Sequence, residues 1–447
     1  MSTSPVPWDR QQRETPAWYR EAGLGIFIHW GAYSVPAWGE PVGELGAVDE
    51  AVWFRHNPYA EWYWNTIRLE GSPARQHHHE VYGDAPYDDF LDAWTAEHFD
   101  APDWLQLFAR AGAQYVVPTT KHHDGITLWD APGTAGRNTV RRGPRRDLVG
   151  ELATATREAG LRFGVYYSGG LDWGVTNLPP IESQDDVLGL RPVDAAYAVY
   201  AGLHVRDLIE KYRPDILWND IEWPDAGKHD GELGLYQLFE RFYQAVPDGV
   251  VNDRWGPTHW DFRTSEYQHA RANEDRAHAW ENNRGIGFSF GYNRREDARH
   301  ILSGPGIARH LADVVSRGGN LLLNVGPTAD GRIPDLQRQS LTELADWMAV
   351  NREAVHGVRP LDTSIAEPSE APWVRWTARD DRVWAIIDGD GCIPVRMDTA
   401  RIDATSATRP DGTPVTVERT DSGVVLDVPA AGGPAGPSVI RFRRAAG

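Results

Sequence analysis

Two carboxylates stand where their positions could support acid–base chemistry. Asp220 follows residues 216–219 (ILWN), and Glu266 ends the stretch of residues 260–266. A glycosidase that retains configuration uses one ionised carboxylate as nucleophile and one protonated carboxyl as acid, roughly 5 to 5.5 Å apart. This pair has the right chemistry if the fold brings the two side chains together. Asp220 could equally cap a helix, and Glu266 could be a surface residue.

Three histidines also follow apolar runs. His29 comes after residues 26–28, and the pair His122-His123 comes after residues 115–120. Imidazole is a frequent metal ligand, so a metal-dependent hydrolase is one interpretation. Adjacent residues on a strand point to opposite faces, however, so at most one of this pair could join a given coordination sphere. We therefore favour hydrogen bonding to hydroxyl groups and expect no metal. The run at 77–80 (HHHE) is expected to be a solvated loop.

Two further polar side chains end apolar runs. Arg254 lies shortly after Val250-Val251, and Tyr166 follows residues 163–165. The arginine-rich stretch 141–146 is expected to be a solvated loop rather than an anion site. No Gly-x-Gly-x-x-Gly or Walker-type loop follows a strand, and we expect neither nucleotide binding nor serine-hydrolase chemistry.

These runs predict the elements that must position the side chains. Helical patterns at 148–159 and 201–212 each precede a buried run, and such alternation is typical of a parallel sheet with helices outside. In a (β/α)8 barrel the carboxyl ends of all strands form the active site. The fold class predicted is α/β: a (β/α)8-like barrel over residues 1–355, followed by a C-terminal antiparallel β-sandwich over residues 356–447. The sandwich is predicted from short apolar runs at 374–377, 383–387, 415–417, 424–428 and 439–442.

Composition limits the classes of partner. The 447 residues include 45 basic and 64 acidic side chains, for a formal net charge of −19. A field of that sign repels nucleic acid and anionic lipid, and nowhere do 18 consecutive apolar residues occur. The single cysteine, Cys392, cannot form an intramolecular disulfide, which favours a cytoplasmic location. The 20 tryptophans suit core packing and stacking on sugar rings, and a homo-oligomer is compatible with the composition.

Several longer motifs, in order, resemble glycoside hydrolase family 29, the retaining α-L-fucosidases. They are residues 24–36 (LGIFIHWGAYSVP), 61–63 (EWY), 119–125 (TTKHHDG), 145–152 (RRDLVGEL), 163–168 (FGVYYS), 218–220 (WND) and 318–327 (GGNLLLNVGP). The resemblance runs from about residue 18 to residue 360. It implies an exo-acting enzyme without a cofactor that hydrolyses terminal α-L-fucose from small glycosides or oligosaccharides.

The resemblance also implies site residues. Asp220 would be the nucleophile of a double displacement, and Glu266 would be the acid/base, with Glu61 as the alternative. The substrate-binding positions would be His29, Glu61, Trp62, His122, His123, Tyr166, Trp218, Arg254 and Phe290. An alternative from another class is a catalytically silent fucose-binding protein.

Overall fold

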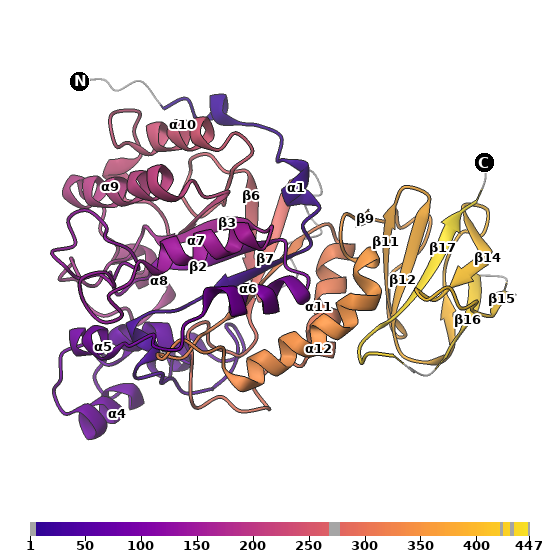
Figure 1. Ribbon diagram of the computed structural model, residues 1–447, viewed down its shortest axis with the longest axis horizontal. Coiled ribbons are helices and arrows are strands. Elements are labelled where there is room, and N and C mark those ends of the chain that lie inside the picture. Colours follow the sequence, from indigo (N-terminus) through magenta and orange to yellow (C-terminus); the bar gives the residue numbers. More distant parts are fainter. Residues whose placement is uncertain (1–5, 268–277, 421–422, 430–432, 446–447) are drawn as a thin grey trace.

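The computed structural model describes residues 6–267, 278–420, 423–429 and 433–445. Eight parallel strands form a barrel in the order β5-β4-β3-β2-β1-β8-β7-β6 (Figure 1). Their bounds are β1 (Leu24–Ile28), β2 (Tyr115–Lys121), β3 (Arg162–Ser168), β4 (Ile216–Asp220), β5 (Val250–Val251), β6 (Phe262–Glu266), β7 (Ala279–Gly285) and β8 (Asn320–Val325). The predicted fold class is confirmed.

The two end strands of this sheet, β5 and β6, close the ring with little backbone pairing. A parallel bridge joins Asn252 to Phe262, and the Asp261 N–H donates to the Val251 carbonyl at 2.8 Å. The Asp261 carboxylate in turn accepts the Val251 N–H at 2.8 Å. The contact between β5 and β6 therefore depends on side chains more than pairs such as β1–β8 and β3–β4, which have ladders of five residues.

Helices cover the outside of the barrel. The main ones are α6 (Ala101–Arg110), α7 (Leu148–Glu158), α9 (Ala195–Tyr212), α10 (Leu235–Ala245), α11 (Gly304–Ser316) and α12 (Asp335–Asn351). Asp147 caps α7, since its carboxylate accepts the Gly150 N–H at 2.9 Å. Gly160, just past this helix, has a φ of +74°, as expected of a glycine that ends a helix. No helix in the described part of the chain has the length and apolar character needed to cross a membrane.

Alternate strand residues divide between two apolar clusters. On β1, Ile26 and Ile28 pack outside with helix residues such as Leu105. Phe27, between them, packs inside the barrel with Trp218. This period of two follows from the pleat of a strand and directs every second side chain into the barrel.

The remaining helices lie in the loops around the barrel. They are α1 (Ala17–Arg20), α2 (Glu50–Arg55), α3 (Tyr63–Thr66), α4 (Pro73–Tyr82), α5 (Asp88–Ala93) and α8 (Gln184–Gly189). The prediction of a loop at 77–80 is wrong, because these residues belong to α4. Pro73 at the first turn and the Ser72 cap, whose hydroxyl accepts the Arg75 N–H, start that helix. His78 is buried against Tyr63 and bonds to the Ala85 carbonyl.

Two antiparallel sheets form the C-terminal part. The first has the order β10-β11-β12-β17-β14, with β9 beside β11, and the second has the order β13-β16-β15. The bounds are β9 (Arg359–Pro360), β10 (Ser369–Glu370), β11 (Trp373–Arg379), β12 (Arg382–Asp388), β13 (Gly391–Val395), β14 (Ile402–Thr408), β15 (Val417–Thr420), β16 (Gly423–Val428) and β17 (Ser438–Arg444). An apolar cluster with members from both sheets makes the core of the sandwich. The strand predicted at 415–417 begins only at Val417.

The sandwich packs on α11 and α12 (Figure 1). Arg375 of β11 forms an ion pair with Asp313 of α11, and the Trp347 indole N–H of α12 donates to the Pro437 carbonyl at 2.9 Å. The predicted division at 355/356 falls between the short 3-10 helix Arg352–Ala354 and β9. The division itself stays a prediction.

Candidate active site

A cavity of about 170 Å³ lies at the carboxyl ends of the barrel strands. Asp220 and Glu266 are the last residues of β4 and β6, and His29 directly follows β1. The cavity brings together all eleven residues singled out from the sequence. They are His29, Glu61, Trp62, His122, His123, Tyr166, Trp218, Asp220, Arg254, Glu266 and Phe290.

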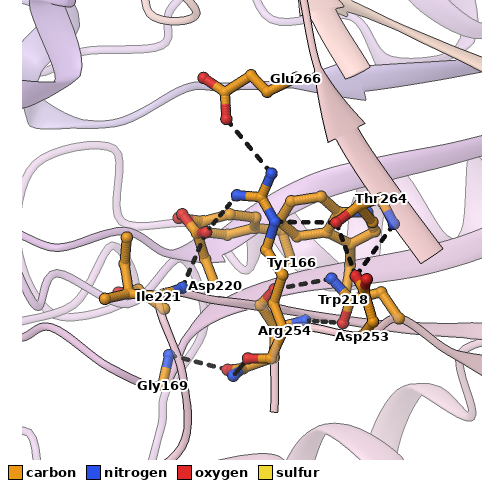
Figure 2. Close-up of polar contacts among 12 residues, drawn as sticks. Tyr166, Gly169, Trp218, Asp220, Ile221, Asp253, Arg254, Thr264 and Glu266 are labelled. Carbon is orange, nitrogen blue, oxygen red and sulfur yellow. Dashed lines mark hydrogen bonds and ion pairs between the residues drawn. The ribbon is translucent and has the colours of Figure 1, made fainter. Parts of the chain in front are cut away.

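Asp220 is buried and accepts three hydrogen bonds at its carboxylate. Its Oδ2 accepts the Tyr166 hydroxyl at 2.7 Å, and its Oδ1 accepts both Arg254 Nη1 at 2.8 Å and the Ile221 N–H at 2.9 Å (Figure 2). Position at the end of a central strand explains the burial, and the donors explain why a charge is tolerated there. The helix-cap interpretation of Asp220 is wrong, because β4 is followed by a turn and only a short 3-10 helix at 225–227.

Arg254 forms ion pairs with both Asp220 and Glu266. Its Nη1 contacts Asp220 as above, and its Nη2 lies 3.3 Å from Glu266 Oε2 (Figure 2). Its Nε donates to Thr264 Oγ1 at 3.1 Å, and the guanidinium lies over the Trp218 ring, 4.8 Å from the ring centroid. One cation thus fixes two carboxylates that are 46 residues apart in the sequence.

The surroundings displace the pKa values of the two acids in opposite directions. Burial raises the pKa of Asp220, but the charge of Arg254 and the hydrogen bonds from Tyr166 and Arg254 together lower it below its ordinary value. Burial also raises the pKa of Glu266, and the charge of Asp220 adds to this, so that the pull of Arg254 is outweighed. Asp220 is therefore the ionised member of the pair and Glu266 the better proton carrier.

Glu61 lines the same cavity in a different environment. Its Oε2 accepts the Gly291 N–H at 2.7 Å and the Ser289 hydroxyl at 3.2 Å, and its residue is 2% exposed. Burial raises the pKa of Glu61 to about 7, against the hydrogen bond from Gly291. Glu266, by contrast, has a side chain 20% exposed and accepts the Tyr59 hydroxyl at 2.9 Å.

The histidines are held as neutral rings. Burial lowers the pKa of His29 to about 3 and that of His123 to about 4, and it also lowers the pKa of His122. His29 Nδ1 lies 2.7 Å from Asn324 Oδ1, so Nδ1 carries the proton. The Ser168 hydroxyl donates to the Leu171 carbonyl, so its oxygen accepts from His123 Nδ1 at 2.7 Å. In both rings Nε2 is then the acceptor, and in His123 it lies 3.8 Å from Asp220 Oδ2.

The expectation that His122 and His123 point to opposite faces is wrong. The strand β2 ends at Lys121, so the alternation of a strand does not extend to the pair. Both rings line the cavity, with centroids 4.0 Å apart. No group of three or more metal-ligating side chains is found in the described ranges.

Aromatic rings make the apolar walls. Tyr166 and Trp218 stack with centroids 5.5 Å apart, and Phe290 packs against His29 at 5.0 Å. Trp62 meets His123 edge to face at 5.3 Å. Such walls suit the C–H faces of a sugar, while the carboxylates and imidazoles suit its hydroxyls.

Sequence reasoning missed a buried acid beneath these rings. Glu281 on β7 accepts the Trp218 indole N–H at 2.9 Å, the Tyr19 hydroxyl at 3.0 Å and the Tyr115 hydroxyl at 2.5 Å. Burial raises the pKa of Glu281 to about 7. No apolar run precedes it, so the signal that revealed the other acids was absent. It also missed Tyr59 and Asn283, which line the cavity.

The spacing Gly-x-Ser-x-Gly, typical of serine hydrolases, does occur at residues 287–291. The single hydroxyl proton of Ser289 is shared between the Gly291 carbonyl at 2.6 Å and Glu61 Oε2 at 3.2 Å, and the hydroxyl oxygen accepts the Ala60 N–H at 2.9 Å. A nucleophile elbow joins a strand to a helix, but between the end of β7 and the start of α11 lie 18 residues outside any helix or strand. Ser289 is therefore a structural residue that positions the loop against Glu61.

Comparisons with known proteins all indicate the same protein family. Residues 3–353 match the family model described as alpha-L-fucosidase. The tissue alpha-L-fucosidase of Homo sapiens is 33% identical over 383 residues, which cover 84% of this chain and 76% of that protein. An alpha-L-fucosidase of Dictyostelium discoideum is 32% identical over 362 residues, covering 79% and 74%. The crystal structure of Thermotoga maritima alpha-fucosidase in complex with fucose aligns with a TM-score of 0.86 at 40% identity, covering 98% of this chain and 100% of that one.

Proposed function

The chain belongs to the alpha-L-fucosidase family of glycoside hydrolases, and from this premise we propose that it removes terminal α-L-fucose by double displacement with net retention, using Asp220 and Glu266. The observation that carries the proposal is the pair of opposite pKa displacements on two acids that share one guanidinium. A retaining mechanism needs one acid charged and the other protonated at the start of the cycle.

The first step uses Asp220 as nucleophile. One carboxylate oxygen attacks the anomeric carbon, the bond to the leaving oxygen breaks, and Glu266 gives its proton to that oxygen. Oδ2 accepts one hydrogen bond and Oδ1 accepts two, so Oδ2 keeps the freer lone pair for the attack. In the second step Glu266 takes a proton from water, whose oxygen displaces Asp220 from the sugar.

The other cavity residues bind the sugar in this proposal. The free Nε2 atoms of His29 and His123 accept hydroxyl protons, and the buried His122 Nδ1 has no partner within the described chain. Phe290 and Trp218 supply apolar surface for the C5 methyl group, and Trp62 and Glu61 complete the wall. Neutral imidazoles suit this role because a hydroxyl can both donate to them and accept from them.

Glu266 is preferred to Glu61 as the acid/base. The two donors on Glu61 Oε2 hold that carboxyl at the base of the cavity wall, and its residue is almost fully covered. The side chain of Glu266 is partly exposed, so it lies where a leaving group meets solvent. The acid that protonates the departing oxygen must lie on the side of the cavity that faces solvent.

Kinetics of two variants test the proposal. Asp220→Ala is expected to lower turnover of an aryl α-L-fucoside by on the order of 10⁴-fold. Glu266→Ala is expected to lower turnover far more for an alkyl fucoside than for an aryl fucoside, because an aryl group leaves without protonation. Glu61→Gln is the matched control and should show no such dependence on the leaving group. A leaving-group effect in Glu61→Gln alone would transfer the role to Glu61.

Product analysis separates the proposal from its alternatives. Azide added to Glu266→Ala is expected to give α-L-fucosyl azide, the product of two inversions, as read from the anomeric proton by NMR. Binding of fucose by the wild-type chain without turnover of any fucoside would instead indicate a silent binding protein. Loss of activity on chelation would indicate a metal-dependent hydrolase. A cytoplasmic location and a homo-oligomer stay predictions from the sequence.

A further inference from the structure

We propose that Leu45 and Ile221, backed by Val187, form a subsite for an apolar leaving group, such as a benzyl group, at the mouth of the cavity. This inference rests on the proposed function and deepens it, because it names the chemical class of the group attached to the fucose. None of these three residues belongs to the set that surrounds the sugar in the proposal above.

Exposure identifies the mouth. The cavity is lined by 20 residues, and only five of them retain appreciable solvent exposure. These are Leu45, Gln184, Ile221, Arg254 and Glu266. Arg254 is committed to the two acids, so the part of the mouth left for a ligand consists of two aliphatic side chains and one amide. Because Glu266 protonates the leaving oxygen, the group on that oxygen must lie at this mouth.

The apolar side chains are held in place. Leu45 and Ile221 both pack against the apolar cluster inside the barrel, and Val187 belongs to that cluster with 7% exposure. The loop that carries Leu45 is tied down by Glu44, whose carboxylate lies 2.7 Å from Arg284 Nη2. A wall that is already ordered costs little entropy when a ligand covers it.

Two helices flank the mouth and are joined to each other. The N–H of Gln184, the first residue of α8, donates to Glu50, the first residue of α2, at 2.6 Å. This contact sets α8, and Val187 with it, against the element that supplies Trp53 and Phe54 to the same cavity. The apolar wall therefore has contributions from three segments far apart in the sequence.

The backbone of Ile221 gives an independent argument. Its φ is +68°, a left-handed conformation that a β-branched residue adopts only at a cost, and where glycine or asparagine is usual. Gly170 provides the space, since a Cβ there would lie 2.8 Å from Ile221 Cβ. Strain at a site next to a catalytic acid indicates a functional use of the side chain. The use that the geometry offers is apolar contact at the mouth.

Two substrates with leaving alcohols of similar acidity test the subsite. The ratio of kcat/KM for benzyl α-L-fucoside to that for methyl α-L-fucoside is expected to be at least about 10 in the wild type, as for other apolar pockets. Leu45→Ser and Ile221→Gly are each expected to lower this ratio by about threefold or more. Ile221→Gly relieves the strained φ but loses the apolar packing of the side chain, so its melting temperature should stay close to that of the wild type.

Leu188→Ser is the matched control. Leu188 is next to Val187 on α8, but its side chain is 53% exposed and does not line the cavity, so the ratio should not change. A ratio near one in the wild type, or an unchanged ratio in both Leu45→Ser and Ile221→Gly, would overturn the inference. If the wild type hydrolyses neither fucoside, the proposed function itself is wrong and the subsite falls with it.

Discussion

Asp220 at the rim of the barrel and Glu281 inside it are both buried and both accept three hydrogen bonds, yet their pKa values move in opposite directions. The donors to Glu281 are two tyrosines and a tryptophan, all neutral. One of the donors to Asp220 is a guanidinium. At Glu281, hydrogen bonds from neutral groups do not offset the rise in pKa that burial causes. At Asp220, the charge of Arg254 does offset it. The rim can therefore hold a charged carboxylate at Asp220, while burial raises the pKa of Glu281 inside the barrel.

Removal of the Arg254 charge should have the largest effect on the difference in pKa between Asp220 and Glu281. Arg254→Met is expected to raise the pKa of Asp220 and lower kcat/KM by on the order of 10²- to 10³-fold. In the proposed mechanism Asp220 reacts in its ionised form, so the acid limb of the pH profile should move to higher pH. The measurement is kcat/KM for an aryl fucoside against pH.

Arg263→Met provides the control for this variant. Arg263 lies on β6, the strand that Arg254 contacts, but its side chain is exposed and does not line the cavity, so both limbs of the pH profile should stay in place. An acid limb that does not move in Arg254→Met would show that the guanidinium does not set the charge of Asp220.

Loss of a neutral donor from the same carboxylate should have a smaller effect. Tyr166→Phe removes the hydroxyl that donates to Asp220 Oδ2 but keeps the ring that stacks on Trp218. We expect kcat/KM to fall by about 10-fold. The acid limb of the pH profile should move to higher pH by less than in Arg254→Met. If the acid limb shifted as far in Tyr166→Phe as in Arg254→Met, Arg254 would not be the main group that lowers the pKa of Asp220.

The interior acid should matter least for activity. Glu281→Gln keeps an oxygen for the Trp218 N–H and offers an amide to the tyrosine hydroxyls, so kcat/KM should change by about twofold at most. A loss as large as in Tyr166→Phe would mean that the acid at this position takes part in the chemistry.

Stability against pH is the more sensitive readout for Glu281. Its pKa is raised from 4.5 to about 7 on folding, so the folded chain binds the extra proton between these values. The stabilisation is complete below pH 4.5 and is lost as the pH rises through 7, by about 3 kcal/mol. Glu281→Gln cannot titrate, so its melting temperature should fall less between pH 5 and pH 8 than that of the wild type. Equal falls in both proteins would show that the buried acid is not linked to folding.

The sequence predicted the barrel where apolar runs end in polar residues. Such runs precede the polar residues at the ends of β1 to β5, and the observed β8 (Asn320–Val325) lies within the motif at 318–327. The strand β7 (AWENNRG) was missed because its inward positions are polar. Glu281 and Asn283 face the interior, and Asn282 bonds to His310 at 2.9 Å instead of packing in an apolar layer. Hydrophobic periodicity cannot reveal a strand whose buried side chains are satisfied by hydrogen bonds.

The candidate site was predicted in residue type more completely than in geometry. Position at strand ends indicated Asp220, Arg254 and Glu266, but nothing in the sequence showed that a single guanidinium joins them. The pair His122-His123 was misjudged because the end of β2 cannot be located to one residue from an apolar pattern. Glu61 and Trp62, in the short 3-10 helix Ala60–Trp62, rested on the resemblance alone, since no periodic pattern marks so short an element.

Arg254 has a second consequence for the molecule. It follows β5 and reaches Thr264 and Glu266 on β6, so it crosses the joint where the rolled sheet meets itself. The side chain whose charge lowers the pKa of Asp220 therefore also links the two edge strands of the barrel sheet, β5 and β6.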